Sequence, residues 1–214
     1  MITILRRLLG VVLILTGVAA LVIGGWFARA LGPDGTAGFT TSPPAGLPLV
    51  IGPDTNARTD IPLTITATAG ADVPITVSIA PPSDAEAFLG DTRYARVTGI
   101  EVRDWAVTTS TRGSAEPMTP TTADLWRSQT TGDGSAEVVA DLENAPETMI
   151  ITTPEGESLT GLEMTWTNPA WFYQALSLVF GGLLAVLIGV ALVIRRSSEA
   201  TDAPSERTAT EVAR

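Results

Sequence analysis

The sequence predicts a mostly β extracytoplasmic domain, an antiparallel sandwich of the immunoglobulin-like or jelly-roll type, flanked by two transmembrane α-helices. Three observations lead to this fold class. Uncharged apolar residues concentrate in two runs near the ends of the 214-residue chain. Short segments in which apolar and polar residues alternate fill the region between them. Charge is uneven, because residues 30–170 hold 19 acidic residues and 6 arginines, a net charge of −13, whereas arginines flank the apolar runs.

The first apolar run is LLGVVLILTGVAALVIGGWFA, residues 8–28, and it follows Arg6 and Arg7. As a helix it rises about 31 Å at ~1.5 Å per residue, which is enough to cross the ~30 Å hydrocarbon core of a bilayer. Because arginines tend to remain on the cytoplasmic side of a membrane, residues 1–7 are predicted to be a cytoplasmic N-terminus and 8–28 the first transmembrane helix.

An alternative for the first run is a cleaved signal peptide. Ala28, Arg29 and Ala30 resemble an A-x-A cleavage site, and the paired arginines followed by two leucines loosely fit a twin-arginine export signal. The run is longer than the ~7–15 apolar residues typical of a signal peptide. An uncleaved anchor is therefore the favoured interpretation.

The second run, residues 171–194, has no charge and one strongly polar side chain, Gln174. Aromatic residues open it, where amphipathic rings prefer the headgroup level, and two arginines follow it. Two spans with both termini in the cytoplasm would place residues 29–170 outside the cytoplasmic (plasma) membrane. The tail, residues 195–214, is polar and lacks apolar periodicity, so it is predicted to be disordered and cytoplasmic. The lipid bilayer is thus the one partner that the sequence directly implies.

Small residues recur at intervals of four in both runs, which predicts that they share one face of each helix. Such faces let helix backbones approach closely inside a membrane. Three interpretations remain open, namely pairing of the two helices within the chain, a surface for oligomers or partners, and ordinary lipid-facing positions. The expected helix-packing residues are Thr16, Ala20, Gly24, Gly181, Ala185 and Gly189.

Between the runs, residues 29–60 are rich in Gly, Pro, Thr and Asp and are expected to form a tether with one short strand around 47–51. The β-sandwich domain is expected over 61–168. It opens with a hairpin whose strands, 63–67 and 73–79, each show a period of two.

A helical turn is predicted next, because Ser83 and Glu86 have the spacing of a capping box. Further strands are expected at 96–103, 105–109, 137–142, 148–153 and 159–166, with a turn at 132–134. Seven or eight short strands at this spacing favour a sandwich. The expected core anchors are Trp105, Trp126 and Trp166, since large rings bury the most area; the alternative for each is a place at a ligand groove.

The chain has no histidine, cysteine or lysine. Ser-His-Asp, Cys-His and Ser-Lys catalytic arrangements are therefore impossible, as are disulfides, and zinc or copper sites lack their usual ligands. No glycine-rich phosphate loop is present, so no cofactor is expected. A net charge of −10 disfavours nucleic acid as a partner.

Paired carboxylates remain the one catalytic arrangement that the composition permits, because two of them can hydrolyse glycosides. The four pairs fall in turns or at alternating outward positions and are expected to be solvated. They are Asp84 with Glu86, Glu101 with Asp104, Asp141 with Glu143, and Glu155 with Glu157.

Two stretches carry a loose resemblance to known proteins. Asp84, Leu89 and Gly90 correspond to a D-x-x-x-x-L-x-G pattern with the glycine one position early, and Trp126, Ser128, Gly132 and Gly134 correspond to a W-x-x-S-x-x-G-x-G pattern with the serine one position early. In these features the chain resembles a group of actinobacterial two-span membrane proteins for which no activity is assigned. The group commonly continues with another tryptophan and an M-N-A-D-G-S turn, where this chain has TTPEGES at 152–158. The resemblance implies the two-span layout with an extracytoplasmic β domain and no particular activity.

The function that these features favour is non-enzymatic: an integral membrane protein that presents an acidic β-sandwich outside the membrane, for binding or for assembly with other membrane or envelope proteins. The alternatives are an extracytoplasmic carboxylate-dependent glycan hydrolase and a sensor or signalling subunit. No metal-binding or catalytic residue is assigned, and the oligomeric state remains open.

Overall fold

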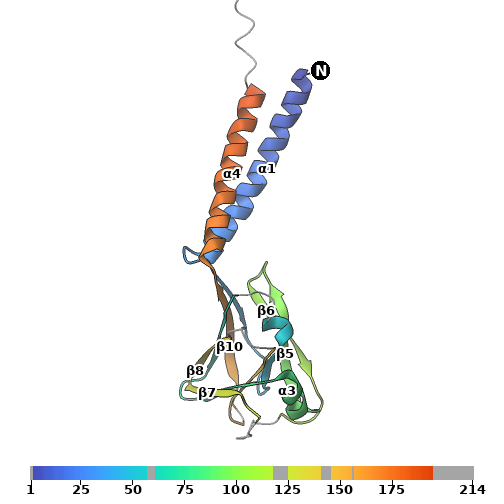
Figure 1. Cartoon of the computed structure of the whole chain (residues 1–214), viewed down its shortest axis with the longest axis vertical. Coiled ribbons are helices and arrows are strands. Elements are labelled where there is room, and N and C mark those ends of the chain that lie inside the picture. The colour runs from blue at the N-terminus through green and yellow to red at the C-terminus, as the bar shows by residue number, and fades with distance from the viewer. Residues whose placement is uncertain (1, 57–60, 118–124, 141–145, 156, 195–214) are drawn as a thin grey trace, which may run out of the picture. The chain divides into compact units, whose positions relative to one another are not determined.

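The computed structural model of the chain describes residues 2–56, 61–117, 125–140, 146–155 and 157–194 (Figure 1). It consists of two compact units, Met1–Ala30 with Phe172–Arg214, and Leu31–Trp171. The first holds two long apolar helices and the second a ten-stranded β domain. The expected mostly β domain between two apolar helices is therefore present.

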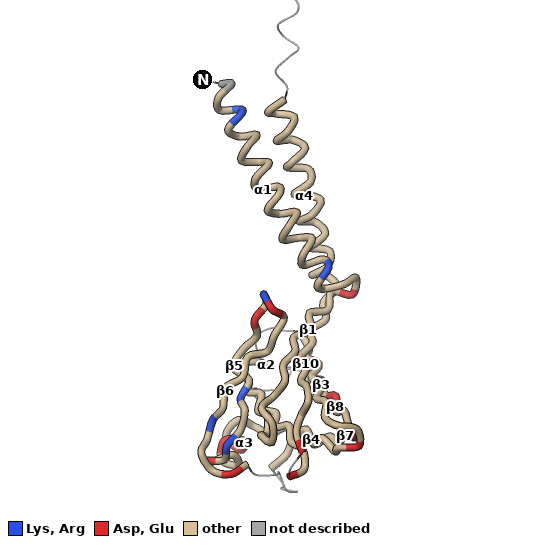
Figure 2. Tube along the Cα trace, turned by 180° about the vertical axis from the view of Figure 1, so that it is seen from behind, with Lys and Arg blue, Asp and Glu red and all other residues tan. Residues whose placement is uncertain are grey.

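The two long helices are α1 (Ile2–Leu31) and α4 (Pro169–Ile194), and both are long and apolar enough to cross a membrane. Only 17% and 11% of the residues in their most apolar stretches are buried. Charged residues are confined to the two ends of α1, and α4 contains none (Figure 2). α1 extends beyond the predicted 8–28 at both ends, because the flanking arginines and alanines are good helix formers.

The β domain contains ten strands and two short helices among the described residues. The strands are β1 (Thr36–Thr41), β2 (Leu49–Ile51), β3 (Leu63–Ala69), β4 (Pro74–Ala80), β5 (Tyr94–Glu101), β6 (Ala106–Arg112), β7 (Ser128–Asp133), β8 (Ser135–Ala140), β9 (Thr148–Thr152) and β10 (Leu159–Thr167). The helices are α2 (Pro53–Asn56) and α3 (Pro82–Leu89).

These strands form one sheet in the order β7-β4-β9-β2-β5-β6-β1-β10-β3-β8. Neighbours are antiparallel except for β2 with β5 and β1 with β6, which are parallel. The outermost strands, β7 and β8, are joined by Gly134, whose φ of +71° favours glycine. Gly134 donates its N–H to the Val73 carbonyl and accepts from the Ala69 N–H. The β7–β8 turn is thereby bonded to the β3–β4 turn.

Residues 29–60, expected to be a tether with one strand, contribute more structure than the sequence predicted. They hold β1, β2 and α2, and β1 lies inside the sheet between β6 and β10. β1 buries only Ala37 and Phe39. In the sequence, these two apolar residues have only Gly38 between them, and prolines follow soon after. This pattern is too short to distinguish a strand from a loop.

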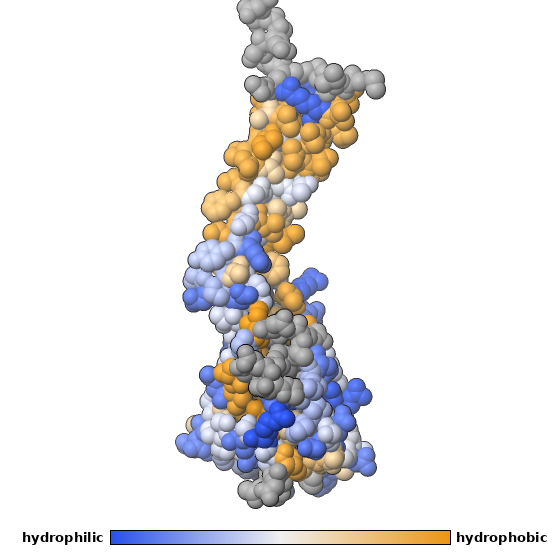
Figure 3. All heavy atoms as spheres, in the orientation of Figure 1, coloured by the Kyte–Doolittle hydropathy of each residue, from blue (hydrophilic) through white to orange (hydrophobic). Residues whose placement is uncertain are grey.

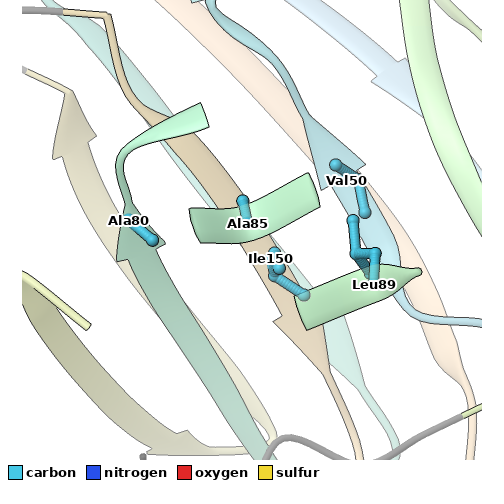
Figure 4. Packing of buried hydrophobic residues seen from close by; sticks show 5 residues of the cluster. All are labelled: Val50, Ala80, Ala85, Leu89 and Ile150. Atoms are coloured by element: carbon cyan, nitrogen blue, oxygen red, sulfur yellow. The ribbon is translucent and has the colours of Figure 1, made fainter. Parts of the chain in front are cut away.

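Strands β2 and β9 are buried along their whole length, which requires cover on both faces. Helix α3 supplies the outer cover, packing Ala85 and Leu89 against residues of β2, β4 and β9 (Figure 4). Figure 4 shows the five buried members of this cluster, which we call the α3 cluster: Val50, Ala80, Ala85, Leu89 and Ile150. On the other side, the domain interior holds Leu49, Ile51, Ile65, Val77, Met149, Ile151, Leu162 and Met164.

Helix α3 begins earlier than the capping-box spacing predicted. Its N-cap is Pro81, and proline at the first helical position suits the fixed φ of that residue. The Ser83 hydroxyl donates to the Asp84 carboxylate, 3.2 Å away, instead of capping the helix. At the other end, the Gly90 N–H donates to the Glu86 carbonyl.

The strands that connect to the two long helices are neighbours in the sheet. β1 follows α1, β10 precedes α4, and their antiparallel register pairs Thr36 with Thr167. The Asn168 N–H donates to the Gly35 carbonyl (3.0 Å), and the Asn168 side-chain oxygen accepts from the Ala170 N–H at the start of α4. Gly35 has a φ of +66°, and a Cβ there would lie 2.1 Å from the Asn168 carbonyl oxygen. Only glycine fits at this position.

We expect Ile150→Ala to lower the free energy of unfolding by about 2–5 kcal/mol, because it leaves a cavity in the α3 cluster. The matched control is Val139→Ala, at a β8 position that is 55% exposed, where a change within about 0.5 kcal/mol is expected. Denaturant unfolding of the full chain in detergent, followed by tryptophan fluorescence, measures both. Equal effects of the two variants would contradict the packing described for α3.

Candidate functional site

Two places in the molecule have the geometry of an interaction site. One is the contact between α1 and α4, where backbones touch. The other is a polar groove on the outer face of the β domain, over β1, β3 and β10. Neither contains a group of three or more His, Cys, Asp or Glu residues suited to a metal ion, within the part of the chain that the structure describes.

The contact between α1 and α4 is made by small residues spaced seven apart. On α1 these are Gly10, Gly17 and Gly24; on α4 they are Ala175, Gly182 and Gly189. The helices run antiparallel, so each step of seven along α1 corresponds to a step of seven back along α4 (Figure 1). A seven-residue repeat corresponds to 3.5 residues per turn, the period of a left-handed pair of supercoiled helices.

The backbones approach so closely that no side chain fits between them. A Cβ built on Gly17 would lie 2.6 Å from the Gly182 carbonyl oxygen, and one on Gly182 would lie 2.7 Å from the Gly17 carbonyl oxygen. A Cβ on Gly189 would lie 2.6 Å from the Gly10 carbonyl oxygen. Carbon and oxygen atoms in proteins do not approach so closely without a bond. The contact therefore requires glycine at these positions.

Four of the six expected helix-packing residues lie on or beside this contact. Gly24 and Gly189 are buried in it, Ala20 has its Cβ 3.1 Å from the position of a Cβ on Gly182, and Ala185 is half-buried. Thr16 and Gly181 differ from the expectation. Thr16 is exposed, and Gly181 has open space where a side chain would be.

The difference follows from helix geometry. With ~3.6 residues per turn, a four-residue step rotates the side chain by about 40°, so two such steps leave the contact face. A seven-residue step rotates it by only about 20°. Four contact residues, Gly10, Gly17, Ala175 and Gly182, were missed for this reason. The seven-residue spacing of small residues in both helices is the signal that identifies them.

The three expected core anchors occupy different depths. Trp166 is 3% exposed and packs edge-on against Phe39, with ring centroids 5.7 Å apart. Its indole nitrogen is buried without a hydrogen-bond partner among the described residues. Trp105 is half-buried on the other side of Phe39, at 5.2 Å. Its φ of +51° is unusual for a large residue and strains the backbone at the end of the β5–β6 loop.

Trp126 lies on the opposite part of the domain, over the α3 cluster. It is half-buried and meets Phe88 edge-on, with ring centroids 5.0 Å apart. Trp166 is thus a core residue, whereas Trp105 and Trp126 cover the margins of apolar clusters. None of the three tryptophans lines the polar groove.

The polar groove has a volume of about 310 Å³ and follows the outer face of three neighbouring strands. The register brings Thr40, Glu163 and Thr66 into one row across β1, β10 and β3. In the next row Gly161 pairs with Thr68, at a β-bulge in β10. The lining residues are Thr40, Thr41, Ser42, Thr66, Thr68, Gly161, Leu162 and Glu163.

Of the three carboxylate pairs that the structure describes, none lines this groove. All members of the pairs Asp84 with Glu86, Glu101 with Asp104 and Glu155 with Glu157 are exposed. The fourth pair, Asp141 with Glu143, lies outside the described residues.

No protein-family model matches the chain, and no curated protein or solved structure matches it either. The function is therefore argued from the geometry of the helix contact and of the β domain.

Gly182→Leu should separate the two helices, because its Cβ alone would collide with the Gly17 carbonyl. Gly181→Leu is the matched control, since the adjacent glycine faces open space. The readout is disulfide formation between cysteines placed at Ala20 and Val179, which lie at corresponding levels of the two helices, in a chain with no native cysteine. We expect cross-linking within one chain in the control and its loss in Gly182→Leu. Equal cross-linking in both variants would contradict the contact.

Trp166→Ala is expected to lower the free energy of unfolding by about 3–5 kcal/mol, the cost of removing a buried indole. Trp126→Ala should cost clearly less, because that ring is half-exposed and its loss leaves no closed cavity. Equilibrium unfolding in detergent compares the two variants. A Trp126 effect equal to or above that of Trp166 would show that the burial order is wrong.

Proposed function

We propose that this protein is a two-span protein of the cytoplasmic membrane that holds its acidic β domain, a closed sandwich, outside the membrane for binding. Its two helices are the transmembrane anchor, both termini are cytoplasmic, and residues 29–170 are outside. The proposal agrees with the layout of the actinobacterial group that the sequence resembles.

The observation that supports the membrane assignment is that the two helices place small residues at their contact and large apolar residues on their outer surface. Small residues meet at the α1–α4 contact, whereas large apolar residues face outward, as with Leu15 (66% exposed), Phe180 (62%) and Leu187 (58%). Figure 3 shows this apolar surface along the helical unit, against a mostly hydrophilic β domain. Water would disfavour such a surface strongly, whereas lipid solvates it at no cost.

Aromatic and basic residues support the proposed orientation. Trp26 and Phe27 of α1 lie at the level of Phe172 and Tyr173 of α4, given the register of the glycine contacts. Aromatic rings gather at membrane interfaces, so this level marks one surface of the bilayer. Arginines mark the other, since Arg6 and Arg7 lie in the first two turns of α1 and two further arginines follow Ile194. By the positive-inside rule the arginine end is cytoplasmic.

A binding role fits the β domain better than hydrolysis. Glycoside hydrolases of the common types use two carboxyl groups about 5–10 Å apart across the substrate. Within the part of the chain that the structure describes, the polar groove is lined by one carboxylate, that of Glu163, together with hydroxyl groups. Such a lining recognises a polar ligand without supplying an acid and a nucleophile.

Labelling of single cysteines with a membrane-impermeant maleimide tests the topology. A cysteine at Ser114, an exposed position of the β domain, should be labelled in intact cells, and one at Ser205 only after permeabilisation. The mass of the mature chain should include the first 30 residues. Labelling at Ser205 in intact cells, or a mature N-terminus at Leu31, would overturn the two-span arrangement.

A further inference from the structure

One glycine, Gly161, lines the polar groove among its threonines, and a second, Gly38, lies beside Glu163 on the same face. On the outer face of β1 and β10, Gly38 and Gly161 present no side chain. A Cβ on Gly161 would lie 2.7 Å from the Thr68 hydroxyl, and one on Gly38 would lie 3.1 Å from a Glu163 carboxylate oxygen. Threonine at either glycine would therefore displace the groups that line the groove. A glycine within a strand often marks such a close approach of a ligand or another backbone.

The groove's polar groups are of two kinds. Thr40, Thr66 and Thr68 lie on the outward-facing side of their strands and contribute hydroxyl groups, which both donate and accept hydrogen bonds. Glu163 contributes a carboxylate, which only accepts. Thr68 accepts a hydrogen bond from the Thr160 hydroxyl (3.4 Å), and a hydroxyl that accepts one bond can also donate one. No ion pair within the described residues engages Glu163.

These groups select for the chemistry of a ligand. Among the described residues no basic side chain lines the groove, and residues 30–170 carry a net charge of −13, so an anion is disfavoured. A compact cation would satisfy the carboxylate but leave most of the hydroxyls to water. A ligand with many hydroxyl groups matches both kinds, because neighbouring hydroxyls can donate to the two carboxylate oxygens and exchange hydrogen bonds with the threonines.

We propose that this groove binds a neutral saccharide, held by Glu163 and the hydroxyl groups of Thr66, Thr68 and Thr40. The volume of about 310 Å³ lies at the lower end of the range of small-molecule sites, ~300–1,000 Å³, and so fits a short segment of a glycan. The proposal deepens the binding role given above by naming the class of ligand. With one carboxylate, the groove binds the glycan without cleaving it.

Two pairs of matched variants test the proposal. Glu163→Gln keeps the size of the side chain and removes its charge. Its control is Glu137→Gln in β8. Glu137 belongs to the same row of paired residues, since Thr66 of β3 pairs with Glu163 on one side and with Glu137 on the other. Thr68→Val removes one lining hydroxyl; its control is Thr64→Val, on the same face of β3 but outside the groove. All four positions lie at or near the surface, so the variants should fold, which circular dichroism and melting verify.

The experiment titrates the full chain in lipid nanodiscs with neutral hexasaccharides (maltohexaose, cellohexaose, mannohexaose and chitohexaose) and follows binding by saturation-transfer NMR, with empty nanodiscs as background. The chitosan hexamer, a cationic counterpart of chitohexaose, serves as the charged comparator. At least one neutral probe should bind. Glu163→Gln should raise the Kd of that saccharide about tenfold, because one charge-assisted hydrogen bond is lost. Thr68→Val should raise the same Kd several-fold. Both controls should leave its Kd unchanged.

Three results would overturn the proposal. They are no binding of any neutral probe, binding that survives Glu163→Gln and Thr68→Val, and tighter binding of the chitosan hexamer than of chitohexaose. The last would identify a cation site instead. Cysteine labelling tests the membrane topology separately, so failure of the saccharide assignment leaves the two-span arrangement standing, and the reverse also holds.

Discussion

The alternation of side chains along β10 is the constraint on which the rest of the β domain depends. Successive residues of a strand point to opposite faces, and β10 is paired on both sides, with β1 and with β3. One set of its residues, Leu162, Met164 and Trp166, enters the core. The other set includes Gly161 and Glu163, which shape the polar groove. A shift of one residue in this register would bury the carboxylate and expose the tryptophan, so core and groove are specified together.

β10 ends at Thr167 and is followed by Asn168, whose side chain accepts a hydrogen bond from the first turn of α4, while β1 begins directly after the turn that follows α1. The two helices therefore enter the domain through neighbouring strands that are hydrogen-bonded to each other. The close approach of Gly35 to Asn168 completes this arrangement. Each end of the β domain continues directly into one of the two long helices. The two strands at these ends, β1 and β10, are paired with each other.

The helical unit follows the opposite rule of side-chain placement from the β domain. In the domain, large apolar residues lie inside, whereas the acidic residues and most of the threonines lie outside, as water requires. In the helical unit, glycines lie at the contact and leucines, valines and phenylalanines lie outside. The proposed membrane location accounts for this difference, because lipid provides no hydrophobic drive for burying a leucine and close backbone packing would hold the helices together.

Composition and periodicity determined much of this protein from the sequence. The absence of histidine, cysteine and lysine restricted its chemistry, two uncharged runs specified two long helices, and regular alternation in β3, β4 and β10 predicted strands. These features are local, because hydropathy and the strand period act on consecutive residues. The buried position of Trp166 followed in the same way from its place in an inward stripe.

Tertiary structure decided what depends on partners distant in the sequence. Which small residues meet depends on how two helices wind about each other, and this replaced Thr16 and Gly181 with Gly17 and Gly182. β1 became a central strand because β10 and β6 flank it, although its own pattern is that of a loop. The groove arises only where Thr40, Glu163 and Thr66, from three strands, come into register. Such contacts are made by pairing across the chain, and no local preference encodes them.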